Sequence, residues 1–168
     1  MIRLLNQLII LTLSISNSFF AMNNKNEIKN ADNHTLSNYS QIRVSHVHLD
    51  LTVDFSQKEL TGFAVLSFQK ETETNTLVLD TKYLLIDRVE DQKEQKLDFN
   101  YLKADELLGT PLSIQLNDSS KLVKVFYKTT AKSEALDWLS SNQTAGKNFP
   151  FMYTQGQSIF TRSWIPIQ

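Results

Sequence analysis

Two pairs of side chains in this sequence have the type and spacing to bind a ligand. His46 and His48 stand two residues apart in an alternating run, so on a strand both would point to the same face. Two imidazoles on one face can hold a metal ion, but zinc sites take three or four protein ligands. This face is the polar one, and no third ligand lies nearby in the sequence. We therefore expect both histidines to face solvent.

The second pair is Gln155 and Gln157, which flank Gly156 in a C-terminal stretch rich in aromatic residues. On a strand the two amides would share a face and offer carbonyl acceptors and N–H donors to a ligand. An edge strand with solvated glutamines gives the same pattern, and the pattern alone favours that reading. Gln155, Gly156 and Gln157 nevertheless form the candidate binding site of the chain.

Motifs for catalysis are absent from the sequence. It contains four glycines, and they form no G-x-G-x-x-G phosphate loop, while no serine stands in a G-x-S-x-G elbow. There is no cysteine, which excludes disulfides, thiolate metal sites and a cysteine nucleophile. His48 is the last of three histidines, so no H-E-x-x-H zinc motif follows it. We expect neither catalytic residues nor metal ligands in this chain.

The overall charge is close to balanced. Seventeen Lys and Arg residues oppose 18 Asp and Glu residues, for a formal net charge of −1. Nucleic-acid-binding domains normally carry a basic patch or stripe. We therefore expect no nucleic-acid partner.

The N-terminus has the pattern of an export signal. Arg3 supplies a positive charge, and residues 4–15 are mostly apolar. Small residues follow, so residues 1–21 are predicted to be a signal peptide cleaved after Ser18 or after Ala21. An uncleaved anchor is the alternative, but the apolar stretch is short for a spanning helix of about 20 residues. The sequence thus predicts a periplasmic or secreted protein without a stable membrane anchor.

The residues that follow divide into a polar segment and a β-rich domain. Residues 22–40 are rich in Asn and Lys and lack apolar periodicity, which predicts an extended or disordered linker. From residue 41 to 168 apolar residues alternate with polar ones in short runs separated by turn residues. Only residues 133–139 could form a single helical turn. This pattern predicts an all-β fold, an antiparallel sandwich or saddle, whose interior includes Val47, Leu49, Leu51, Val53, Leu66, Phe68 and Val125.

Three blocks of sequence resemble the N-terminal domain of zinc aminopeptidases of the leukotriene A-4 hydrolase type. The first runs from His46 to Phe68 and the second from Thr76 to Val89, with its LVLDTK core. The third, from Ala135 to Arg162, reads ALDWLSSNQTAGKNFPFMYTQGQSIFTR. The resemblance spans residues 44–168, with a looser stretch at 92–122.

The resemblance implies a modular peptidase that removes N-terminal residues from peptides. In that family the zinc ligands come from an H-E-x-x-H helix and a later Glu of a catalytic domain beyond this region. The N-terminal domain contributes a Gln-x-Gln loop, which corresponds to Gln155-Gly156-Gln157 here. The implied role of Gln157 is to accept a hydrogen bond from the peptide α-amine, and Gln155 would help form the pocket for the first side chain. Gly156 replaces a larger residue of the family, which predicts a looser loop.

Two hypotheses follow for the function. The first is that the chain is the substrate-cleft domain of an exported zinc aminopeptidase, truncated before the zinc site and inactive by itself. The peptide N-terminus and the absent catalytic domain would then be its partners. The alternative is a stand-alone secreted β-sandwich that binds peptides or proteins through its aromatic C-terminal surface.

Overall fold

A computed structural model of the protein describes residues 32–168. The predicted signal peptide at residues 1–21, and the first part of the predicted linker, lie outside the described residues. Between residues 32 and 168 no helix is long and apolar enough to cross a membrane.

The described residues form three antiparallel sheets, which confirms the all-β prediction. The largest sheet has five strands in the order β1-β2-β8-β4-β5. Their bounds are β1 Ile42–Asp54, β2 Glu59–Lys70, β8 Leu122–Lys128, β4 Leu85–Asp91 and β5 Lys96–Leu97. A second sheet has the order β3-β7-β6, with bounds Thr76–Leu79, Leu112–Gln115 and Phe99–Tyr101.

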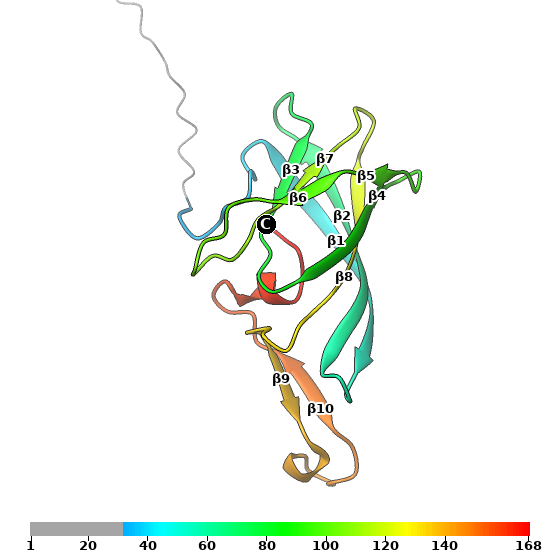
Figure 1. Cartoon of the computed structure of the whole chain (residues 1–168), viewed down its shortest axis with the longest axis vertical. Coiled ribbons are helices and arrows are strands. Elements are labelled where there is room, and N and C mark those ends of the chain that lie inside the picture. The colour runs from blue at the N-terminus through cyan, green and yellow to red at the C-terminus, as the bar shows by residue number, and fades with distance from the viewer. Residues whose placement is uncertain (1–31) are drawn as a thin grey trace, which may run out of the picture.

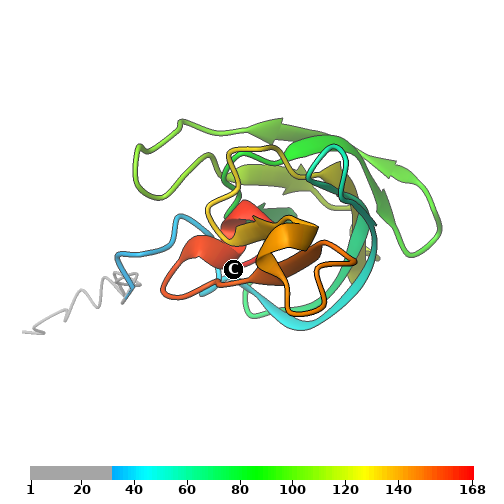
Figure 2. The same cartoon turned by 90° about the horizontal axis from the view of Figure 1, so that it is seen from below.

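The third sheet is a two-stranded hairpin of β9 (Leu136–Leu139) and β10 (Phe151–Thr154). It extends away from the two larger sheets, and the short 3-10 helix η1 (Ser141–Gln143) lies near its tip (Figure 1). A second 3-10 helix, η2 (Phe160–Ser163), follows β10 and returns the chain to the body of the molecule. Seen from below, the curved five-stranded sheet wraps around this C-terminal segment (Figure 2).

The hydrophobic core lies between the two larger sheets. Apolar side chains of both sheets meet there because alternate residues of each strand point inward. The fully buried members are Ile42, Ala64, Leu66, Leu77, Leu79, Leu112, Ile114, Val123 and Val125.

The predicted interior is confirmed except at one position. Leu66, Phe68 and Val125 are buried, and Val47, Leu49 and Leu51 are half-buried against the core. Val53 was expected inside but is 40% exposed. Val53 is the second-last residue of β1, and the turn end of the β1–β2 hairpin extends past the three-stranded sheet (Figure 1).

The helical turn considered for residues 133–139 is wrong. Leu136 to Leu139 instead form β9, paired in register with β10 from Leu136 opposite Thr154 to Leu139 opposite Phe151. A seven-residue segment is too short to hold a helix by itself, so pairing with a neighbouring strand decides its conformation.

The polar segment before residue 41 also differs from the expectation, where the structure describes it. Residues 32–40 are not a free linker, because Ser37 is buried and Asn38 bonds to β3 at two points. The Asn38 amide donates to the Thr76 carbonyl at 2.7 Å, and its oxygen accepts from the Val78 N–H at 2.8 Å. Polar side chains thus hold this segment, and apolar periodicity could not reveal that.

Candidate functional site

The three candidate residues lie in the connection between β10 and η2. Strand β10 ends at Thr154, although the Gln155 N–H still donates to the Ala135 carbonyl at 2.9 Å. The Gly156 carbonyl accepts from the N–H groups of Phe160 and Thr161 at 2.9 and 3.2 Å. The strand expected to carry both glutamines therefore stops before them, and the pair belongs to a loop held at both ends.

The side chains of Gln155 and Gln157 are exposed, and neither amide makes a hydrogen bond within residues 32–168. Gln168 shows the opposite behaviour, since its amide donates to the Ile42 carbonyl at 2.7 Å and accepts from the Val44 N–H at 2.8 Å. Each free amide offers one carbonyl acceptor and two N–H donors. The loop can therefore present both polarities to a ligand.

Gly156 fits its position because there is no room for a side chain. A Cβ at this residue would press against Thr161 Oγ1, well inside van der Waals contact. The glycine was expected to loosen the loop, but the structure shows its carbonyl bonded twice and its Cα packed against Thr161. The close approach between Gly156 and Thr161 accounts for the glycine.

Arg162 anchors the far side of the loop. The residue is 6% exposed, and each guanidinium nitrogen has a partner. Nε donates to the Ile159 carbonyl at 3.0 Å and Nη1 to the Leu108 carbonyl at 2.9 Å. Nη2 donates to the His34 carbonyl at 2.6 Å and lies 3.4 Å from Asp80 Oδ2. One side chain thus joins four segments that are distant in the sequence.

Asp80, which directly follows β3, completes this anchor. It is 1% exposed, and its carboxylate accepts from Thr35 Oγ1 at 2.5 Å and from the Leu36 N–H at 2.9 Å. Its backbone also pairs with Ile167, with N–H to carbonyl distances of 2.6 and 3.1 Å. The buried charge of Asp80 is therefore balanced by Arg162 and by two further donors, as a desolvated carboxylate requires.

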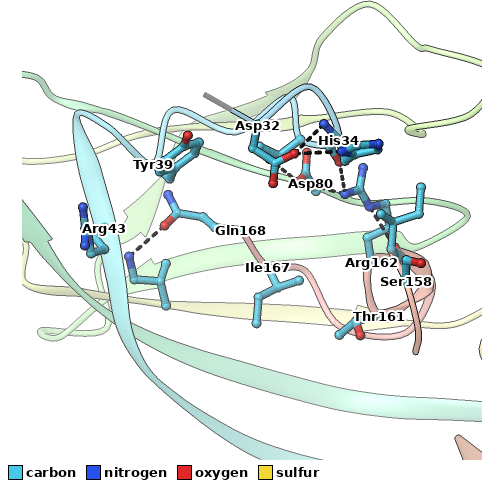
Figure 3. A pocket seen from close by; sticks show the side chains of 13 residues that line it. Asp32, His34, Tyr39, Arg43, Asp80, Ser158, Thr161, Arg162, Ile167 and Gln168 are labelled. Carbon is cyan, nitrogen blue, oxygen red and sulfur yellow. Dashed lines mark hydrogen bonds and ion pairs between the residues drawn. The ribbon is translucent and has the colours of Figure 1, made fainter. Parts of the chain in front are cut away.

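A cavity of about 720 Å³ opens beside this anchor. Figure 3 shows Asp80, Arg162 and Ser158 on one side of it and Gln168 and Arg43 on the other. Ser158 and Ile159, which directly follow Gln157, line the cavity, whereas Gln155, Gly156 and Gln157 do not. Two of the cavity's charged side chains, Asp80 and Arg162, are already paired with each other.

Aromatic side chains continue the line of the glutamines along β10. Phe151 and Tyr153 are exposed and their rings stack with centroids 6.5 Å apart. Asp137, opposite Tyr153 across the hairpin, raises the pKa of the Tyr153 phenol by hydrogen bonding and by its charge.

The histidine pair has the exposure predicted for it. His46 and His48 lie on β1 with exposed side chains. Among residues 32–168 no group of three His, Cys, Asp or Glu side chains is close enough to hold a metal ion. The donors in this part of the protein do not fit a zinc site.

The family is decided by a comparison with known protein families. The Peptidase M1 N-terminal domain matches residues 37–168, most of the chain. The chain belongs to the peptidase M1 family. The match confirms the resemblance carried by the three sequence blocks, and it begins four residues before the predicted start of the β-domain.

Relatives of this M1 domain include proteins named leucine aminopeptidase 2 and leukotriene A-4 hydrolase homolog. This chain is 38% identical over 138 residues to a leucine aminopeptidase 2 of Yarrowia lipolytica, and the match covers 80% of this chain and 21% of the relative. A leukotriene A-4 hydrolase homolog of Botryotinia fuckeliana is 33% identical over 144 residues, 82% of this chain and 22% of its own length. The chain thus spans about a fifth of the length of these relatives.

Solved structures agree with the sequence relatives. Yeast LTA4 hydrolase in complex with bestatin superposes with a TM-score of 0.75 at 33% identity, over 81% of this chain and 22% of the yeast chain. An M1 zinc metallopeptidase of Deinococcus radiodurans has a TM-score of 0.54 at 18% identity and shares the fold. The M1 domain is therefore similar in both sequence and fold to part of yeast LTA4 hydrolase.

Sequence reasoning assigned no role to Asp80 or Arg162. A faint signal existed, since Asp80 directly follows the apolar residues 77–79 and Arg162 stands between Phe160 and Trp164. Charged residues inside apolar stretches are seldom fully buried unless they are paired. The pairing itself depends on the fold, which brings residues 80 and 162 together.

Proposed function

We propose that this M1 domain lines the substrate cleft of a zinc aminopeptidase, and that Gln157 recognises the free α-amine of the bound peptide. The observation that carries the proposal is the exposed Gln-x-Gln loop, whose amides have no partner within residues 32–168. A neutral amide oxygen can accept a hydrogen bond from a substrate ammonium group without adding a buried charge. Gln155 would contact the first side chain of the peptide.

Zinc belongs to the proposed whole protein and not to this domain. The described residues hold no suitable group of ligands, so the metal would be bound by a catalytic domain elsewhere in the protein. When bound, such a zinc ion polarises the scissile carbonyl and activates water. The residues of this domain would hold the peptide by its N-terminus while that chemistry proceeds.

We also propose that the β9–β10 hairpin contacts that catalytic domain. Phe149 is 78% exposed, Phe151 54% and Tyr153 44%, and all three stand on or beside β10. An exposed group of large apolar side chains in one place is typical of an interaction surface. Because this surface continues into Gln155 and Gln157, it would place the loop at the edge of the cleft.

Steady-state kinetics on the complete protein test the role of Gln157. Hydrogen bonds to charged groups contribute about 1.5–3 kcal/mol. Gln157→Ala should therefore lower kcat/KM for aminoacyl anilides by about one to two decades. Gln157→Glu should have a milder effect, since it keeps the acceptor and adds an attractive charge. Unchanged kcat/KM in Gln157→Ala would show that the residue does not bind the amine.

The control for this experiment is a glutamine of similar exposure far from the loop. Gln57 lies in the β1–β2 turn and is exposed. Gln57→Ala should keep the kcat/KM of the parent protein. The zinc content of all variants should equal that of the parent, because the proposed metal ligands lie outside this domain.

We propose export on the basis of the N-terminal pattern. Arg3, the apolar residues 4–15 and the small residues Ser18 and Ala21 support a cleaved signal. N-terminal sequencing of the protein from its native host should find a chain that begins at residue 19 or 22. An intact N-terminus would contradict the proposal.

A further inference from the structure

We infer that Arg162, with its buried partner Asp80, is a positioning residue that sets the place of Gln157. The inference rests on the proposed function, since it concerns how the same loop is held. Arg162 cannot itself be a substrate ligand here, because it is buried and each of its three nitrogens already has a partner. Its effect on a substrate must therefore pass through the residues that it holds.

The shortest route from Arg162 to the loop runs through Ile159. Arg162 Nε donates to the Ile159 carbonyl at 3.0 Å, two residues beyond Gln157. The Phe160 and Thr161 N–H groups bind the Gly156 carbonyl, one residue before Gln157. Gln157 therefore lies within a turn that is closed on one side by backbone bonds and on the other by the guanidinium.

Arg162 in turn is fixed to parts of the fold that do not belong to the loop. The Leu108 and His34 carbonyls and the Asp80 carboxylate hold it against three other segments. The Arg162 carbonyl accepts from the Lys82 N–H at 2.9 Å, which adds a backbone bond next to β3. These contacts fix the position of the loop relative to the sheet, and not relative to the hairpin alone.

Only arginine can make these contacts together. Its planar guanidinium presents N–H donors in a fixed fork, whereas a lysine ammonium is a single compact charge on a flexible stem. Arg162→Lys would keep the charge near Asp80 but could not reach the Ile159, Leu108 and His34 carbonyls at once. A misplacement of about 1 Å in a positioning group can lower a rate by up to about a hundredfold.

A double-mutant cycle in the complete protein tests the inference. Four proteins are compared on aminoacyl anilides: the parent, Arg162→Lys, Gln157→Ala and the double variant. Arg162→Lys should lower kcat/KM by about tenfold or more, mainly through KM, with unchanged zinc content. In the Gln157→Ala background the same change should have little further effect, because residues that act through one another are not additive.

Two results would overturn the inference. One is a loss of kcat/KM that is equal in both backgrounds, which would indicate general damage to the fold. The other is parent-like kinetics in Arg162→Lys although Gln157→Ala is impaired, which would leave the proposed function standing. If Gln157→Ala itself has no effect on kcat/KM, the proposed function is wrong, and the inference that rests on it is wrong as well.

A second variant and a control guard against unfolding. Asp80→Asn keeps the shape of the side chain, removes its charge and places an amide donor among the donors that surround it. It should behave as Arg162→Lys does in the same cycle, and additivity would again contradict the inference. Val125→Ala, a fully buried change on β8 away from the loop, should lower thermal stability but leave KM unchanged.

Discussion

At the scale of single residues, the loop depends on a contact between Gly156 and Thr161. The glycine carbonyl begins the turn that leads into η2, and its Cα packs against the Thr161 side chain. A larger residue between the glutamines would therefore need a different partner at position 161. The identity of one residue in the loop is coupled to the identity of another five positions later.

Gly156→Ala should therefore destabilise the domain. The added methyl group meets Thr161 Oγ1, while the Thr161 Cβ lies at 3.4 Å, which is an ordinary contact. Forcing the threonine aside should lower the free energy of unfolding by about 1 kcal/mol. In a protein that already carries Thr161→Ala, the change Gly156→Ala should lower the free energy of unfolding much less than it does in the parent. Thermal melts of the four proteins give the coupling, and additive effects would show that the contact is unimportant.

At the scale of elements, strands with clear alternation were predictable from the sequence. Residues 47–55 alternate strictly and residues 60–68 have an apolar residue or glycine at every second position, so the β1–β2 hairpin follows from the sequence. β9 did not follow, because it exists only through its pairing with β10. The contacts of Arg162 could not be predicted from the sequence either, because only the folded protein brings its partners at residues 34, 80 and 108 together.

The turn between β4 and β5 makes a pH-dependent contribution. Asp91 Oδ1 accepts from the N–H groups of Lys93 and Gln95 at 2.8 and 3.0 Å, and Oδ2 accepts from the Asn117 amide at 3.3 Å. Burial favours a higher pKa for the Asp91 carboxyl, but the Gln95 and Lys93 N–H groups, the Asn117 amide and the Lys93 charge together outweigh it and leave the pKa below its ordinary value. A lowered pKa in the folded state means that the folded protein favours the ionised form.

Asp91→Asn should therefore lower the melting temperature at neutral pH. The contribution of Asp91 is fully present above the pKa of the unfolded chain, about 3.9. It is lost as the pH falls through the lower pKa of the folded protein. The difference between parent and variant should thus narrow below about pH 4. Thermal melts from pH 3 to 7 measure this difference in melting temperature, and Asp98→Asn, at an exposed aspartate, is the control. A difference between parent and Asp91→Asn that does not change with pH would contradict the role given to the Asp91 carboxylate.

At the scale of the whole molecule, the proposed function gives this domain the recognition of the peptide and leaves the chemistry to another domain. The sequence has no cysteine and no histidine after His48, and residues 32–168 hold no group of three metal ligands. The 168-residue chain should therefore release no amine from aminoacyl anilides, with or without added Zn²⁺. Circular dichroism should confirm a β-rich fold in the same sample. Release of amine that depends on zinc and stops with a chelator would contradict this expectation.

The central claim is that Gln157 receives the peptide amine, and a structure of the complete protein with a bound peptide tests it most directly. The measured quantity is the distance from Gln157 Oε1 to the α-nitrogen of the peptide. We predict a hydrogen bond of about 2.7–3.2 Å, with the loop between β10 and η2 held by Arg162 as it is here. A peptide whose amine contacts only residues outside this domain, with the Gln157 amide turned to solvent, would contradict the account.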